Sequence, residues 1–315
     1  MILKKNLSPL RVWSYIKGPL SFAVLWAILV WALFHFTGRK ELALNFTPIG
    51  VLGSALAIFI AFRNNSAYSR WWEARTQWGN IVQSTRVLTR LIITFTDSHA
   101  HQPNYERDRS EAFKRALVYK CIAWAHALRL HLRQPSDWEQ LKPLLGESEY
   151  QALQQTQNKP NFLQLLIGRK IYEAMANGTL GGFDSFQMEG QLLALANAQG
   201  ACERIKNTPL PRQYDYFTRL FIWLFAALLP FGLLSFFQAE NLAAFTWLTI
   251  PLAALIAGVF IIMERTGAAK EDPFENRVTD VPLSALCNTL ERDLREMLGE
   301  EALPEKMEPQ NGYLD

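Results

Sequence analysis

The sequence predicts an all-α membrane protein with four transmembrane helices and a large cytosolic helical domain. Half of the 315 residues are hydrophobic while 19% are charged, and the apolar residues gather in four long blocks. The second block passes without a break signal into a segment rich in arginine, tryptophan and glutamate. No segment shows the sustained alternation with a period of two that marks a strand. These observations favour helices throughout the chain.

Residues 1–62 are predicted to form the first two transmembrane helices. The first apolar block, 19–36, follows a basic N-terminal segment. It is longer than a signal-peptide core and lacks a small-residue cleavage site, so we interpret it as an anchored helix. The second block, 46–62, would rise roughly 26 Å as a helix, enough to cross most of a bilayer's hydrocarbon core. A membrane helix that continues into water is typical of a conduit or a signalling stalk.

The cytosolic helical domain is predicted over 63–214. Its first part, 66–96, has apolar residues at mixed spacings of three and four and therefore continues the second helix. A polar stretch at 96–104 ends that helix. Further helices are expected over 105–133, 162–175 and 185–206.

The third and fourth transmembrane helices are predicted within 215–263, in apolar blocks at 217–237 and 242–263. Pro230 and Pro251 interrupt these blocks. Bilayer helices tolerate proline when neighbouring groups satisfy the freed carbonyls.

The end of the chain is predicted to be cytosolic. Residues 264–298 favour a helical segment. The tail 299–315 is polar and contains two prolines, so we expect it to be disordered.

The charge distribution predicts that both termini and the long segment between the second and third blocks face the cytoplasm. Basic residues such as Lys17 and Arg63 flank the blocks on this side, whereas the connector 238–241 has none. Arg39 and Lys40 lie on the opposite side but are outnumbered. Cytoplasmic loops carry the excess of lysine and arginine in membrane proteins.

Composition and motifs argue against several functional classes. A net charge of +3 without a basic run gives no reason to expect a nucleic-acid partner. No phosphate-binding loop, nucleophile elbow, zinc-protease or dinucleotide-binding pattern is present, so we expect neither an enzyme nor a cofactor. Cys121, Cys202 and Cys287 are far apart, and the histidines lack partners at ligand spacing. We therefore expect no metal knuckle.

Steps of four along the second helix place five residues on one face: Gly50, Ser54, Ile58, Phe62 and Ser66. Small residues at both ends and bulky apolar residues between them would line a narrow constriction if copies packed around an axis. The same column can instead face lipid or pack into a core. Periodicity alone leaves both interpretations open.

Charged residues follow this column directly beyond the membrane: Arg63, Arg70, Glu73 and Arg75. They can form a solvated face with pairs three residues apart, such as Arg70 with Glu73. Alternatively, Arg63, Arg70 and Glu73 can set the electrostatics of an inner vestibule.

Three segments carry a resemblance to a known family. They are FRNNSAYSRWWEAR (62–75), GACERIKNTPLP (200–211) and EDPFEN with TDVP (271–282). Their order and spacing, with the four apolar blocks around them, resemble the bestrophin family, in particular its bacterial branch. The resemblance covers residues 1–298.

The resemblance implies a homopentameric ion channel embedded in membrane lipid, here the bacterial inner membrane, with five copies of the second helix around one pore. The family has a hydrophobic neck at three positions spaced by four. Counted back from the Arg-Trp-Trp of the first motif, these positions are Ser54, Ile58 and Phe62. Ser54 departs from the apolar residue expected there, so the outermost ring is expected to be wetter and wider.

The resemblance also implies a cytosolic aperture made by one apolar side chain. It lies seventeen residues before the glycine of the second motif, which gives Phe183. The preceding Gly181 and Gly182 leave the register open, so Phe186 is the second candidate.

Animal members of the family bind calcium through an acidic cluster after the fourth helix. This chain has only Glu271, Asp272 and Glu275 there, without a run of consecutive acids. These residues are the candidates for a metal, but we expect opening without calcium.

The permeant species is expected to be a small monovalent ion. The family implies anions such as chloride. A sodium or potassium channel is the first alternative. A non-conducting helical membrane sensor or scaffold, with a partner-binding patch on its cytosolic domain, is the second.

Overall fold

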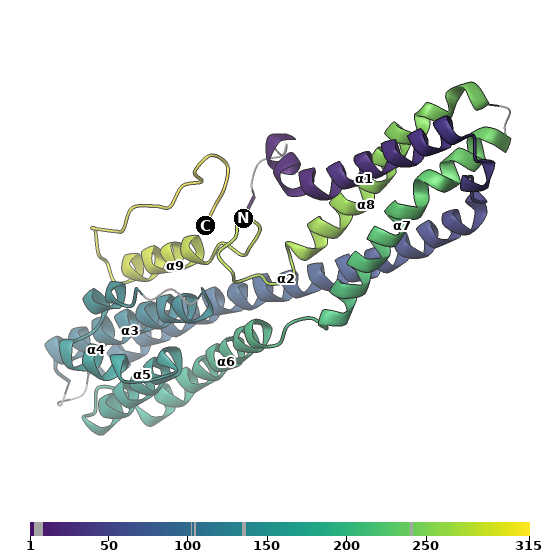
Figure 1. The fold of residues 1–315 in the computed structure, drawn as a ribbon. Helices are drawn as coiled ribbons and strands as arrows, with labels where there is room; N and C mark the ends of the chain where they lie inside the picture. Colours follow the sequence, from purple (N-terminus) through teal and green to yellow (C-terminus); the bar gives the residue numbers. More distant parts are fainter. Residues whose placement is uncertain (3–8, 102, 104, 134–136, 240–241) are drawn as a thin grey trace. The chain divides into compact units, whose positions relative to one another are not determined.

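The computed structural model describes residues 1–2, 9–101, 103, 105–133, 137–239 and 242–315. Within these ranges every regular element is a helix, apart from isolated bridges that join Tyr313 to Ile2 and Gln310 (Figure 1). Among the described residues, four helices are long and apolar enough to cross a membrane. The predicted all-α fold with four helices that could span a membrane is therefore confirmed.

The chain divides into two compact units. The membrane unit contains 4–70 and 209–271, and the helical unit contains 1–3, 71–208 and 272–315. The division into compact units does not test the predicted boundaries between membrane and cytosolic segments. Residues 63–70, 209–214 and 264–271, expected in the cytosolic part, group with the transmembrane helices.

Four helices build the membrane unit: α1 (Pro9–Thr37), the first part of α2 (Phe46–Thr96), α7 (Arg212–Ala239) and α8 (Thr249–Ala268). The second helix continues past the apolar block as predicted, because α2 extends to Thr96. Pro230 lies inside α7 as expected. The fourth block differs, since a 3₁₀ helix (Ala243–Leu248) precedes α8 and places Pro251 in the first turn. Proline at that position removes no helical hydrogen bond.

Glycines allow helices of the membrane unit to approach closely. A Cβ on Gly53 of α2 would come within 2.8 Å of the Phe225 ring, and one on Gly232 of α7 within 2.8 Å of Ile49. Small residues commonly mediate helix contacts in bilayers, where van der Waals packing drives association. The two contacts hold the buried face of α2 against α7.

The helical unit contains the rest of α2 and five further helices: α3 (Arg107–Arg133), α4 (Glu147–Gln154), α5 (Lys159–Ala176), α6 (Gly182–Asn207) and α9 (Leu283–Met297). Its core includes the fully buried Trp78 and Trp124. The Trp124 indole N–H donates to Gln199 Oε1 at 3.1 Å. The long helices agree with the predicted ones to within a few residues.

The tail 299–315 is irregular and contacts α3 and α9, and its expected disorder stays a prediction. Glu300 accepts a hydrogen bond from Arg295 Nε at 2.8 Å. Asp315 pairs with Arg133 at 2.6 Å. The tail thus supplies carboxylates to a half-buried arginine on α9 and to a buried arginine side chain on α3. A polar composition alone does not reveal these partners.

Candidate functional site

The column predicted on α2 is solvent-accessible in the single chain. Ile58 is 60% exposed and Phe62 is 70% exposed, while Leu56 and Ile60 on the other face are buried. Ser54, one turn before Ile58, is also exposed, and its hydroxyl donates to the Gly50 carbonyl at 3.1 Å. The membrane part of α2 therefore has one face packed in the unit and one apolar face that the described residues leave exposed.

Exposure alone does not separate a pore from lipid. Leu25 of α1 is 66% exposed and Val51 of α2 is 65% exposed, so other apolar side chains of the membrane unit are equally open. Both interpretations of the column remain compatible with a single chain. The assignment of Ser54, Ile58 and Phe62 to a neck stays a prediction.

Arg63 does not share the exposed environment of the column, and its expected place in a vestibule stays a prediction. Its side chain is only 2% exposed. One amino group, Nη2, lies 2.6 Å from Asp215 Oδ1 and 2.8 Å from Glu271 Oε1, and Nη1 lies 3.4 Å from Glu264 Oε1. The physical reason is the helical turn of 100° per residue, which directs Arg63 inward when Phe62 points outward.

Two further arginines balance the carboxylates around Arg63. Arg219 pairs with Asp215 four residues earlier on α7, and Arg265 Nε lies 3.5 Å from Glu264 Oε2 on α8. Three arginines thus meet three carboxylates, which is the condition for burying charge inside a protein. This charge cluster joins α2, α7, α8 and the residue at the end of the membrane unit, Glu271.

Arg70 and Glu73 keep a more open environment than Arg63. Glu73 accepts a hydrogen bond from Arg204 Nη2 at 2.6 Å, between side chains that are 41% and 65% exposed. Arg70 is half-buried. Glu73 thus has a partner on α6, and the pair between Arg70 and Glu73 stays a prediction. A vestibule role for Arg70 and Glu73 stays a prediction.

The three sequence motifs meet one another in the helical unit. Trp71 Nε1 donates to the Thr279 carbonyl at 3.0 Å, which joins the first motif to the third. Glu73 and Arg204 join the first to the second. Lys206 Nζ donates to Glu275 Oε1 at 2.6 Å and joins the second to the third. The motifs therefore specify how α2 and α6 are fixed to the segment before α9.

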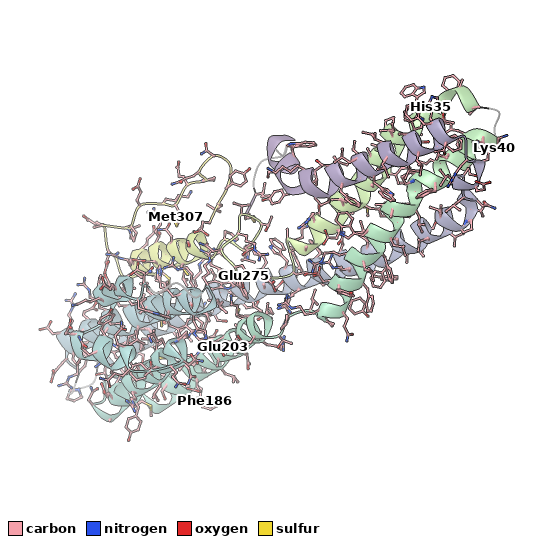
Figure 2. The ribbon with its side chains drawn as sticks, viewed as in Figure 1. His35, Lys40, Phe186, Glu203, Glu275 and Met307 are labelled. Atoms are coloured by element: carbon pink, nitrogen blue, oxygen red, sulfur yellow. The ribbon has the colours of Figure 1, made fainter. Side chains whose placement is uncertain are left out.

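The aperture candidates lie on the first two turns of α6. Phe183 is 74% exposed and Phe186 is 73% exposed. Figure 2 labels Phe186. Asp184 accepts a hydrogen bond from the Gly181 backbone N–H at 3.3 Å, which fixes the start of the helix. Residues three apart share a helix face, so both phenylalanines present one apolar surface. The structure gives no reason to prefer one register.

The acidic residues after the fourth membrane helix have cationic neighbours. Glu271 contacts Arg63, and Glu275 contacts Lys206. Among the described residues no group of three histidine, cysteine or acidic side chains has a geometry that could hold a metal ion. The expectation that calcium is not needed stays a prediction.

The third motif also contains a buried acid that the motif analysis did not single out. Asp280 is 1% exposed, and its Oδ2 accepts the Arg277 backbone N–H at 3.0 Å. Burial raises the pKa of this carboxyl, against the hydrogen bonds and the positive charge of Arg277 and Arg133. An acid followed by valine and proline gives no signal of burial in the sequence.

A family model described as "Bacterial/Fungal Bestrophin protein" matches residues 8–296 of this chain. A relative from Escherichia coli K12, named a voltage-dependent anion channel-forming protein, is 30% identical over 304 residues, covering 96% of this chain and 93% of the relative. A relative from Ralstonia nicotianae with the same description is 30% identical over 273 residues, covering 86% and 83%.

The fold is similar to that of a solved structure. The crystal structure of a bacterial bestrophin homolog from Klebsiella pneumoniae matches with a TM-score of 0.81 and 28% sequence identity. The match covers 91% of this chain and all of the other. It therefore spans both the membrane helices and the helical unit.

Proposed function

This chain belongs to the bacterial and fungal bestrophin family, and from that premise we propose that it is a homopentameric channel for small monovalent anions such as chloride. The observation that carries the proposal is the family match over residues 8–296. The apolar column on α2, with Ile58 60% and Phe62 70% exposed in a single chain, supplies the proposed neck. The names of the relatives support anions. We assign no catalytic activity.

In the proposed assembly, five copies of Ser54, Ile58 and Phe62 form the neck. Rings of isoleucine and phenylalanine offer no groups that replace an ion's hydration shell. Such a constriction conducts when it is wide enough to stay wetted and closes by dewetting when it narrows. Ser54 adds a hydroxyl ring at one end, which makes that end easier to wet.

Ion selection in this proposal comes from the surroundings of the neck, because the neck itself has no charge. Phenylalanine rings have a positive edge that favours anions. Arg70 and Glu73 contribute vestibule charge. Arg63 contributes little, because its charge is balanced by the carboxylates within 3.4 Å.

The remaining features of the proposal are the orientation in the membrane, the cytosolic aperture and the independence from calcium. The distribution of basic residues supports the orientation. The protein lies in the bacterial inner membrane with both termini in the cytoplasm. The exposed phenylalanines Phe183 and Phe186 then form the cytosolic aperture. Opening does not require calcium, since Glu271 and Glu275 already have cationic partners.

The test is the reversal potential of purified protein in a planar bilayer between NaCl solutions that differ tenfold. A shift towards the chloride equilibrium potential, about 59 mV from zero at perfect selectivity, supports the proposal. A shift of opposite sign identifies a cation channel and contradicts the proposed ion. No current from protein shown to be folded and pentameric contradicts the channel and favours a sensor or scaffold.

The neck is tested by the double substitution of Ile58→Ala and Phe62→Ala. It should widen and wet the constriction and raise conductance. Leu25→Ala is the matched control, because Leu25 is equally exposed but lies on α1. Equal conductance in the double variant and the wild type would contradict the neck assignment.

A further inference from the structure

We infer that Arg219 and Arg265 form a binding site for the phosphate of an anionic phospholipid, at a hollow between α1, α7 and α8. The inference goes beyond the proposed channel and does not depend on ion flux. It rests on the lining of the hollow, the state of the two guanidinium groups and their place near the ends of the membrane spans.

The hollow combines basic and apolar walls. Arg219 and Trp223 come from α7, Ile261 and Arg265 from α8, and Pro19 from α1. Its volume is about 40 Å³, enough for a small polar group. The hollow can therefore take one small group, and the rest of a ligand must lie along the outer surface.

Both guanidinium groups can donate further hydrogen bonds to another partner. The Arg219 side chain is 56% exposed and that of Arg265 is 50% exposed. Arg219 uses Nη2 for Asp215, and Arg265 directs Nε towards Glu264. Because a guanidinium has five N–H donors, each group keeps donors for the oxygens of a phosphate.

Glu264 also lines the hollow but does not oppose an anion there. Its side chain is 7% exposed, and its carboxylate faces Arg63 and Arg265. Its negative charge is thus balanced within the charge cluster. The most exposed charged groups at the rim are the two guanidinium groups, whose side chains are 56% and 50% exposed.

The apolar wall identifies a lipid rather than a soluble anion. Trp223 is 42% exposed and meets the Phe22 ring edge-on with centroids 4.9 Å apart. Arg219 lies near the start of the third candidate span and Arg265 near the end of the fourth. Basic pockets between transmembrane helices at the membrane surface are typical sites for anionic headgroups. The acyl chains would then lie along Trp223 and its apolar neighbours.

The test is native mass spectrometry of the full-length protein, titrated with phosphatidylglycerol and with phosphatidylcholine. We expect wild type to retain phosphatidylglycerol more tightly. Each arginine near a membrane surface contributes about fivefold to the binding of anionic lipid, so Arg219→Gln with Arg265→Gln should weaken it about thirtyfold. Arg39→Gln, which removes one exposed arginine from the loop before α2, should leave it unchanged.

Further measurements separate the sources of the phosphate and the effects of folding. Inorganic phosphate in large excess should not displace the lipid; full displacement would show a site for free phosphate and overturn the lipid assignment. Arg219→Lys with Arg265→Lys keeps both positive charges and should retain most of the phosphatidylglycerol binding. Loss of binding in the glutamine variant but not in the lysine variant would show that the charges bind the lipid. Equal loss in both variants would overturn the inference. Equal retention of the two lipids by wild type, or equal loss in Arg39→Gln, would also overturn the inference.

Discussion

Phe62 and Arg63 are adjacent in the sequence and have opposite environments. Phe62 is 70% exposed, whereas the whole residue Arg63 is 4% exposed and its guanidinium group pairs with three carboxylates. The residue that we propose as one ring of the neck is thus anchored, through its neighbour, to α7 and α8. We infer that the orientation of the column on α2 depends on the charge cluster.

Replacing Arg63 by methionine should strongly destabilise the membrane unit. Removing one partner of a buried ion pair leaves an uncompensated charge and costs about 3–5 kcal/mol. The expected result is a lower midpoint of thermal unfolding in detergent. Arg39→Gln, at an exposed position, should change the free energy of unfolding by no more than about 0.5 kcal/mol.

A second substitution identifies the cause of this loss. Adding Glu264→Gln to Arg63→Met removes a carboxylate whose side chain is 7% exposed, so it should recover part of the stability. Strictly additive losses in the double variant would show that the charge balance is not the reason.

The position of Arg63 could not be predicted from the sequence. Its partners Asp215 and Glu264 come 152 and 201 residues later. A helical pattern shows that Arg63 is turned away from Phe62, but it cannot tell whether that side meets water or carboxylates. The spacing of four, in contrast, predicts directly that Ile58 and Phe62 share one face of α2.

At the scale of elements, the apolar blocks were sufficient to predict the four membrane helices and the continuation of α2. They were not sufficient for the start of α8, because a 3₁₀ turn with the residues Ala243–Leu248 is as apolar as the helix that follows. The contacts of the tail 299–315 could not be predicted from the sequence, for a different reason. Its anchors are single contacts to α3 and α9, and single contacts leave no periodicity.

The contact between α2 and α8 depends on a glycine. A Cβ added to Gly267 would overlap the side chain of Asn64, which donates to the Met263 carbonyl at 2.9 Å. Gly267→Ala should therefore lower the stability of the membrane unit by about 1–3 kcal/mol, measured as a lower midpoint of thermal unfolding.

Two variants test whether this overlap is the cause. Asn64→Ala removes the overlapping atoms and should suppress part of the effect of Gly267→Ala. Gly168→Ala on α5 is the matched control, because its Cβ would meet no atom within 4 Å. That substitution should be neutral or stabilise by about 0.5–1 kcal/mol, since alanine favours a helix interior. Equal losses in both glycine variants would indicate that the α2–α8 contact is not responsible.

At the scale of the whole molecule, the assembly is the part that one chain cannot specify. The part of the chain that the structure describes leaves the apolar column on α2 exposed, and symmetric oligomers bury such faces between copies. A pentamer has a mass of five times 36.0 kDa, or 180 kDa, which light scattering of the purified protein measures directly. Mass alone does not show which face is at the axis.

Cysteine cross-linking tests the axis. Ile58→Cys would place five thiols around a narrow ring, where neighbouring subunits come close enough for a disulfide, which needs Cβ atoms about 4 Å apart. Oxidation should give a band at twice 36.0 kDa on a denaturing gel. Leu25→Cys, equally exposed on α1, should give none.

The native cysteines do not interfere with this experiment. Burial raises the pKa of Cys121, Cys202 and Cys287 to about 12 each, so their thiols stay protonated and unreactive near neutral pH. Cross-linking of Ile58→Cys alone would therefore locate the column at the contact between copies. Cross-linking of Leu25→Cys instead would move the axis to α1, and the neck formed by Ser54, Ile58 and Phe62 would have to be abandoned even if the protein conducts.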